Sequence, residues 1–257
     1  MNSGKSAEVT IDTSQHKAAR VAGFMFLFAF LVPTLNWTLG LSRFIVVENV
    51  VATAKNIIAN EWLFRVGIAV ELIMSVGLIV LAVALYTVLK TVNRNLALLA
   101  LSLKLVEAAI VAAIVLASFI ALRISDGATS LTAFTPEQLL APVGFLLNQH
   151  TIVYSIPMVF LGLNMTVFFY LFLRSKYIPG LLAGFGILSF AIILIHALGN
   201  ILAPRYATMT VVEFICYTPS GIAEIVVGML LLVKGIKVPQ DDSRTSESPE
   251  TAINNMR

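Results

Sequence analysis

The stretch LALLALSLKLVEAAIVAAIVLASFIAL, residues 96–122, decides the fold class. It is longer than the roughly 20 apolar residues that an α-helix needs to cross a hydrocarbon core about 30 Å thick. Lys104 and Glu107 nevertheless lie near its middle, three residues apart, so they share one face of a helix. Because a lone charge at the bilayer centre costs at least about 2.5–3.5 kcal/mol, this stretch predicts a membrane helix with a buried charged face.

The composition of the whole chain agrees with a membrane protein. Of 257 residues, 58% are hydrophobic and only 12% are charged, and the mean hydropathy is +0.92. Soluble domains carry about 25% charged residues. The net charge of +3 does not indicate nucleic-acid binding, because the basic residues are scattered between apolar runs. A single cysteine, Cys216, leaves no pair for an intramolecular disulfide.

Six apolar runs are long enough to cross a bilayer. They are residues 19–41, 63–89, 96–122, 150–173, 180–202 and 211–233. We therefore predict an all-α, polytopic bundle of six transmembrane helices, with a membrane domain over residues 17–236. The polar composition of residues 1–16 and 237–257 predicts a disordered tail at each end.

Lys and Arg are distributed unevenly between the two sides of this bundle. Eleven lie in the tails and in the loops at 90–95 and 174–180, and five lie on the other side. The eleven are Lys5, Lys17, Arg20, Lys90, Arg94, Arg174, Lys176, Lys234, Lys237, Arg244 and Arg257, and the five are Arg43, Lys55, Arg65, Arg123 and Arg205. Because Lys and Arg are enriched in cytoplasmic flanks, we predict a multi-pass protein of the cytoplasmic membrane with both termini in the cytoplasm.

The longer loops on the other side each have a helical apolar pattern of their own. They are ENVVATAKNIIANE (48–61) and FTPEQLLAPVGFLLNQH (134–150). Thr135 precedes Pro136 and Gln138 in the second, which is typical of a capped helix start. We predict two short amphipathic helices that lie in the membrane interface.

Four ionisable residues are expected at similar depth and facing one another: Glu71, Lys104, Glu107 and Glu224. Three carboxylates against one ammonium leave an excess of negative charge, which either a proton or a bound cation would neutralise. This excess favours a ligand- or ion-binding centre. The alternative is that the charges only lock the helices together.

The sequence around Glu224, CYTPSGIAE (216–224), contains a second indication of a site. Pro219 cannot donate a hydrogen bond to the carbonyl of Ile215, so the helix is expected to be kinked or locally open there. Interrupted helices beside a buried acid line solute sites in transporters. The small residues Gly180 and Gly184, in contrast, are expected to serve close helix packing.

A further polar group is expected toward the side away from the termini, as an outer vestibule: Arg65, His150, His196 and Glu213. Two histidines and a glutamate are zinc-ligand types, but the chain has no HxxxH or HExxH spacing. We therefore predict no metal and no other cofactor. An intramembrane metal-dependent enzyme using His150 and His196 is the less favoured alternative.

Five stretches together resemble a bacterial membrane family catalogued as domain of unknown function 4386. They are AARVAGFMFL (18–27), TAKNIIANEWLFRVGI (53–68), LYTVLKTVNRNLALLALSLKLVEA (85–108), FFYLFLRSKYIPGLLAGFGIL (168–188) and AEIVVGMLLLVKGI (223–236). The resemblance implies a six-span protein with a cation at Lys104, where family members typically carry Arg, and an acid at Glu224. It also implies a Glu–x–x–x–Arg pattern at Glu61 and Arg65. The family has no established activity, so the resemblance assigns no catalytic residue.

The leading interpretation is binding or transport of a small polar or ionic solute through the Glu71/Lys104/Glu107/Glu224 centre, with a proton as a candidate partner. We expect a lipid bilayer around the protein, no nucleic-acid partner and no catalytic residues. The alternative is a structural or accessory membrane protein. The sequence leaves the ligand, the direction of transport and the oligomeric state open.

Overall fold

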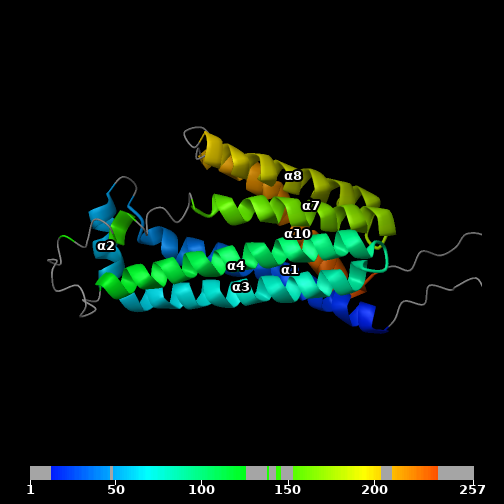
Figure 1. Cartoon of the computed structure of the whole chain (residues 1–257), viewed down its shortest axis with the longest axis horizontal. Helices are drawn as coiled ribbons and strands as arrows, with labels where there is room; N and C mark the ends of the chain where they lie inside the picture. Colours follow the sequence, from blue (N-terminus) through cyan, green and yellow to red (C-terminus); the bar gives the residue numbers. More distant parts are fainter. Residues whose placement is uncertain are drawn as a thin grey trace, which may run out of the picture.

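The structure is a computed structural model that describes residues 13–46, 49–125, 138, 143–145, 153–203 and 210–236. All regular elements within these ranges are helices (Figure 1). They are α1 (Thr13–Leu39), the 3₁₀ turn η1 (Leu41–Arg43), α2 (Val50–Ala59), α3 (Glu61–Leu89), α4 (Arg94–Ser125), α7 (Ser155–Ser175), α8 (Gly180–Leu202) and α10 (Thr210–Lys234). Six of these described helices, all but η1 and α2, are long and apolar enough to cross a membrane. The predicted all-α fold with six spans is confirmed.

The ends of the helices follow local chemistry. Asn49 caps α2, because its side chain accepts a hydrogen bond of 2.9 Å from the amide of Ala52. The chain leaves α7 through Lys176, whose φ of 56° is left-handed. It leaves α10 through Gly235 at φ 67°, a conformation that glycine adopts without strain and that commonly ends helices.

Helix α1 begins at Thr13 rather than near residue 19, so the last residues of the predicted N-terminal tail are helical. Gln15 explains the difference. Its side chain is buried against the end of α3, where Nε2 donates a hydrogen bond of 3.1 Å to the hydroxyl of Thr91. Gln15, a polar residue within the predicted N-terminal tail, therefore holds the first turn of α1 against the bundle by burial and a hydrogen bond. The remainder of both predicted tails lies outside the described residues.

The six long helices form a closed ring in which each packs against the next one in the chain. Helix α1 packs on α3, α3 on α4, α4 on α7, α7 on α8 and α8 on α10, and α10 returns to pack on α1. The first turn of α1 and the last turn of α10 lie at one end of the bundle, here called the terminal end, and α2 lies at the opposite end, the α2 end (Figure 1). Both termini of the helical bundle therefore face the same side, while the identity of that side stays a prediction.

Apolar side chains fill the terminal end of the ring. They come from all six long helices and from the turn after α7, and they include Phe26, Leu85, Phe169, Phe190 and Leu231. Phe169 contacts the rings of both Phe26 and Phe190, at centroid distances of 6.5 Å and 5.4 Å. This cluster is here called the terminal plug. It contains none of the four polar residues of the predicted centre.

A second apolar cluster holds α2 against the rest of the protein. Ala54 and Ile57 of α2 are buried with Phe64 of α3 and Leu122 of α4. The first predicted short helix is thus present, with Ala54 and Ile57 of its apolar face buried against protein and Val51 and Ile58 of that face exposed. The second, at 135–147, lies almost entirely outside the described residues.

Glycines allow two pairs of helices to approach closely. A Cβ atom at Gly23 of α1 would lie 2.4 Å from the backbone nitrogen of Leu232 in α10, and one at Gly162 of α7 would lie 2.7 Å from Cβ of Leu194 in α8. The expectation for Gly184 is wrong, because a Cβ there would meet no atom within 4 Å. The contact face of α8 carries Gly186 instead, which packs against Phe169.

Candidate functional site

A cavity of about 440 Å³ lies inside the ring of helices. All six long helices contribute to its wall, together with Tyr154, which directly precedes α7. Its wall includes Thr38 at the end of α1 and Glu213 at the start of α10, so the cavity extends toward the α2 end. The terminal plug lies at its other end.

The structure brings the four predicted central residues to this one cavity. Glu71 of α3, Lys104 and Glu107 of α4, and Glu224 of α10 all line it. Three of them are almost fully buried, with exposed fractions of 6% for Glu71, 1% for Lys104 and 3% for Glu107. Glu224 is half-buried.

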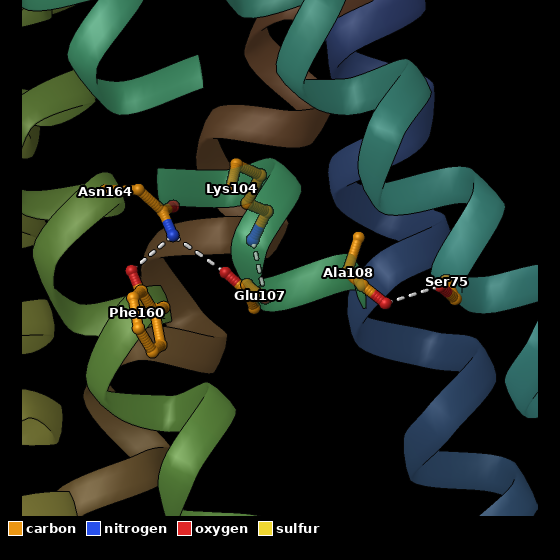
Figure 2. A network of polar contacts seen from close by, with 6 residues as sticks. All are labelled: Ser75, Lys104, Glu107, Ala108, Phe160 and Asn164. Carbon is orange, nitrogen blue, oxygen red and sulfur yellow. Dashed lines mark hydrogen bonds and ion pairs between the residues drawn. The ribbon is translucent and has the colours of Figure 1, made fainter. Parts of the chain in front are cut away.

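Lys104 and Glu107 form an ion pair within one turn of α4 (Figure 2). Their Nζ and Oε1 atoms are 3.0 Å apart, as their spacing of three residues allows. The other carboxylate oxygen of Glu107 accepts a hydrogen bond of 2.7 Å from Nδ2 of Asn164 in α7, and this amide also donates to the carbonyl of Phe160. Both oxygens of Glu107 therefore have partners, and the pair ties α4 to α7.

A hydroxyl beside this network ties α4 to α3. Oγ of Ser75 donates a hydrogen bond of 2.8 Å to the carbonyl of Ala108, one residue after Glu107 (Figure 2). Ser75 itself is 4% exposed. The segment of α4 that carries Lys104 and Glu107 is thus fixed by side chains of both neighbouring helices.

Glu71 has a different partner. The hydroxyl of Tyr154 donates a hydrogen bond to its carboxylate. Burial and the nearby negative charge of Glu71 raise the pKa of Tyr154 well above its ordinary value. The phenol therefore keeps its proton and stays available as the donor to Glu71.

Glu224 is the least satisfied of the four central residues. It lies within electrostatic range of Lys104 and Glu107. Across the described part of the chain, however, its carboxylate forms neither a hydrogen bond nor an ion pair. Because Glu107 already pairs with Lys104, Glu224 presents to the cavity a carboxyl group that has no hydrogen bond or ion pair with any described side chain.

Two further polar residues in the wall were not predicted from the sequence. Asn200 of α8 and Ser155 of α7 line the cavity and are 7% and 2% exposed. Oδ1 of Asn200 and Oγ of Ser155 find no hydrogen-bond partner within the described ranges. The available signal was a lone polar residue in an apolar run, which also holds for Asn164. Buried polar atoms normally have a partner, so these two acceptors indicate a place for a donor.

The predicted outer vestibule is only partly assembled. Glu213 lines the cavity, and His196 packs edge-on against the ring of Tyr217, a lining residue, with 5.1 Å between centroids. Arg65 pairs with Glu61 on the same helix and is not among the lining residues. His150 lies outside the described residues. The described ranges contain no group of three metal-ligating side chains close enough to hold an ion.

Helix α10 does not open at Pro219. The helix is continuous from Thr210 to Lys234. Oγ of Ser220 donates a hydrogen bond of 2.7 Å to the carbonyl of Tyr217, and Gly221 packs against the ring of Phe30. Of the two expectations, a locally open helix is therefore not found, whereas a kink at Pro219 stays a prediction. Ser220, Gly221 and Glu224 line the cavity.

The charges in the wall are unbalanced. The described lining residues include four carboxylates, Glu71, Glu107, Glu213 and Glu224, but only one ammonium, that of Lys104. The remaining wall is mainly apolar, with side chains such as Phe30, Met74 and Ile193. Such an arrangement can accept protons or hold a cation.

The comparisons with known proteins place the chain in a family without assigning an activity. Neither the curated proteins nor the solved structures contain a match to it. A family model described as "Domain of unknown function (DUF4386)" matches residues 21–235. This range contains every described residue of the cavity wall, from Ala29 to Glu224, and confirms the resemblance found in the sequence. The chain belongs to this family, whose function is unknown.

Proposed function

We propose that this protein binds or transports a small polar or ionic solute through the cavity that contains Glu71, Lys104, Glu107 and Glu224. We further propose that it does so in the cytoplasmic membrane, with both termini in the cytoplasm. The observation that carries the proposal is the convergence of these four residues, from three helices, on one cavity of about 440 Å³. Ligand pockets in proteins typically measure about 300–1,000 Å³ and combine apolar walls with a few polar groups.

The excess of carboxylates supports a solute or proton that brings positive charge. Ionisable residues within membrane helices are rare because they are costly, and they mark solute and proton pathways. An ion pair alone would need one acid for Lys104, which Glu107 provides. Glu71, Glu213 and Glu224 exceed that need.

The terminal plug closes one end of the cavity, which supports entry of the solute from the α2 end. The terminal plug separates the cavity from the end at which α1 begins and α10 finishes. Passage across the membrane would therefore require the helices to rearrange around the solute, as in alternating-access transporters. A protein that only binds its solute requires no such rearrangement.

Native mass spectrometry of the protein in lipid nanodiscs, beside Glu224→Gln, tests this proposal. We expect a bound solute that the variant loses. Glu61→Gln is the matched control, because it makes the same change to a carboxylate that does not line the cavity. If both variants and the unchanged protein are equally folded and equally empty, and proteoliposomes show no pH-dependent flux over a broad solute panel, the proposal fails.

One observation favours the structural alternative. The contacts of Lys104, Glu107 and Asn164 connect α4 to α7, which is what charges that lock a bundle would do. That alternative expects the exchange of both charges, Lys104→Glu with Glu107→Lys, to restore folding that either single change destroys. It also expects Glu224→Gln to have no functional consequence.

A further inference from the structure

We infer that the cavity has a second polar level near the α2 end, formed by Ser155, Asn200 and Glu213, and that this level binds the hydroxyl groups of a neutral diol carried on an apolar body. This assignment rests on the proposed function, because a solute must enter the same cavity, and it specifies the chemical class of that solute.

Ser155 and Asn200 lie at the same level on two neighbouring helices. Gly162 of α7 packs against Leu194 of α8, and the turn that joins these helices belongs to the terminal plug. Ser155 lies seven residues before Gly162, and Asn200 lies six residues after Leu194. At about 1.5 Å per residue, both are therefore about 9 to 10 Å from this contact in the direction of the α2 end.

Glu213 lies at this level on the next helix of the ring. The ring of His196 on α8 packs edge-on against that of Tyr217 on α10. Asn200 follows His196 by four residues and Glu213 precedes Tyr217 by four, so both lie about 6 Å nearer the α2 end than this contact. Helix α8 packs against both α7 and α10, and all three side chains line the cavity. Ser155, Asn200 and Glu213 are here called the outer level.

The outer level is distinct from the predicted centre. Glu213 and Glu224 are eleven residues apart on one continuous helix, which separates them by about 16 Å along its axis. The cavity wall also includes the apolar side chains of Met158, Leu161 and Ile193. Leu161 and Ile193 are adjacent in sequence to the two residues of the α7–α8 contact, so they lie between the outer level and Glu224. A solute at the outer level therefore meets an apolar wall on its inner side, which favours an apolar body.

The outer level offers both donors and acceptors of hydrogen bonds. An Asn side chain carries a carbonyl oxygen and an NH₂ group, a Ser hydroxyl both donates and accepts, and a carboxyl group accepts in either protonation state. Asn200 and Ser155 are 7% and 2% exposed, and Oδ1 of Asn200 and Oγ of Ser155 find no hydrogen-bond partner in the described part of the chain. Buried polar groups normally have partners, so a matching polar group of a solute would complete them.

Hydroxyl groups match this set better than charged groups do. An ammonium group only donates, so it offers no acceptor to the NH₂ group of Asn200. A carboxylate or phosphate only accepts, so it offers no donor to Oδ1 of Asn200 or to the carboxyl group of Glu213. A hydroxyl group does both, and two adjacent hydroxyls can serve Asn200 and a neighbour on α7 or α10 at once. This match does not depend on whether Glu213 carries a proton.

Trp37 makes the assignment measurable. It lies fourteen residues after Gly23, and Tyr217 lies fifteen residues before Leu232, which packs against Gly23. Trp37 is therefore at the level of Tyr217, about 6 Å from the outer level, and it lines the cavity. The other tryptophan, Trp62, is 78% exposed and is not among the lining residues. In a Trp62→Phe background, fluorescence reports on Trp37 alone.

The test compares four compounds that share one apolar body. The protein, in phosphatidylcholine nanodiscs at neutral pH, is titrated with phenylpropanediol, with the single alcohol phenylpropanol, with the cation phenylpropylamine and with the anion phenylpropanoate. We expect the diol to bind saturably and more tightly than the other three compounds, because it alone brings two hydroxyl groups.

Substitutions in the outer level should weaken binding of the diol. Asn200→Leu and Ser155→Ala should each do so about three- to tenfold, as loss of a neutral hydrogen bond does. Glu213→Gln, which removes an acid but keeps hydrogen-bonding groups, should leave the affinity nearly unchanged. The control Asn60→Leu makes the same change as Asn200→Leu at an exposed position outside the wall and should have no effect. Ser155→Ala, which removes a single oxygen atom, provides the test if Asn200→Leu does not fold.

Three results would overturn the assignment. They are tighter binding of the amine or the anion, an affinity for the diol that is unchanged in the folded outer-level variants, and the absence of saturable binding. A repeat in nanodiscs that contain phosphatidylglycerol, whose headgroup ends in a diol, distinguishes two sources of the same chemistry. Competition by this lipid identifies a lipid headgroup as the ligand, and lack of competition identifies a free solute.

Glu224→Gln separates this assignment from the proposed function. Phenylpropanediol is too short to span the distance of about 16 Å from the outer level to Glu224, so its affinity should be unchanged in this variant. If native mass spectrometry finds a solute that Glu224→Gln loses but the diol does not bind, the proposed function stands and the outer level fails. If the diol binds as expected and no solute depends on Glu224, the outer level stands and the role of the central charges fails.

Discussion

Asn164 on α7 donates a hydrogen bond to Glu107 on α4, with 2.7 Å between Nδ2 and Oε2. This contact occupies the carboxylate oxygen that Lys104 does not reach, and thereby completes the coordination of a charge buried inside the bundle. It divides the predicted centre into two parts. Lys104 and Glu107 are coordinated by protein, and Glu224 faces the cavity without such a partner.

Replacing Asn164 should therefore destabilise the bundle without changing its charge. Asn164→Leu leaves Oε2 of Glu107 buried without a donor, and we expect a loss of about 1–3 kcal/mol in the free energy of unfolding. Reversible unfolding in mixed detergent micelles measures this. Asn60→Leu, in the exposed turn before α3, is a control that should change stability far less. Equal effects of the two substitutions would contradict the role given to Asn164.

The ion pair should show strong coupling between its members. Lys104→Met leaves Glu107 as an uncompensated buried charge, and breaking a buried pair in this way costs about 3–5 kcal/mol. Removing both charges, Lys104→Met with Glu107→Leu, should recover most of that loss. Thermal unfolding of the single and double variants gives the coupling energy. Additive losses would show that the two side chains do not act as a pair.

Close contact between α1 and α10 should make Gly23 intolerant of a side chain. In Gly23→Ala the new Cβ would meet the backbone of Leu232 at 2.4 Å, so the two helices must separate. We expect a destabilisation of about 1–3 kcal/mol, as for overpacked cores. Gly184→Ala places its Cβ in open space and should be neutral or stabilising by up to about 1 kcal/mol. The melting temperature should consequently fall in Gly23→Ala and stay the same or rise in Gly184→Ala.

The hydrogen bond from Tyr154 to Glu71 should make stability depend on pH at alkaline values. The folded protein raises the pKa of Tyr154 above the ordinary value of about 10. It therefore holds this proton more tightly than the unfolded chain does, and the resulting stabilisation is complete below pH about 10 and declines as the pH rises further. The difference in unfolding free energy between the unchanged protein and Tyr154→Phe should be constant from pH about 7 to 9 and shrink above 10. If this difference in unfolding free energy stayed constant above pH about 10 as well, the role given to the Tyr154 proton would be refuted.

The orientation in the membrane can be tested through the two ends of the chain. Because the flanks at the terminal end are rich in Lys and Arg, reporters fused to either terminus should be cytoplasmic. A fused fluorescent protein should fluoresce, and a fused alkaline phosphatase should be inactive. A reporter inserted in the loop between α4 and α7 should give the opposite result. Active phosphatase at both termini would reverse the assignment.

The spans were predictable because their signal is local. A run of about 20 apolar residues identifies a membrane helix by length alone, and the spacing of Lys104 and Glu107 places them on one face of it. Their pairing at 3.0 Å follows from that spacing and needs no knowledge of the other helices.

Contacts between helices were much less predictable, because they depend on how each helix is rotated and shifted against its neighbour. Asn164, Asn200 and Tyr154 gave no signal beyond being polar residues near apolar runs, yet they complete the cavity wall or its hydrogen bonds. The spacing of Gly180 and Gly184 suggested a contact face, but α8 packs through Gly186 instead. Pro219 removes one hydrogen bond by its chemistry, and α10 remains helical around it.

The closed ring of helices also determines in what order the protein can fold. Five of its six joints connect helices that follow each other in the chain, so each new helix can pack on the one inserted just before it. The contact of α10 with α1 joins the first and the last of the six long helices and can form only after α10 itself has been inserted. Before that step the growing wall is open along one side, and Glu71, Lys104 and Glu107 have no enclosed cavity. Gly23 thus lies in the helix–helix contact that forms last, that of α1 with α10. A substitution that disrupts this contact should leave an intermediate in which the other five helix–helix contacts have formed, rather than an unfolded chain.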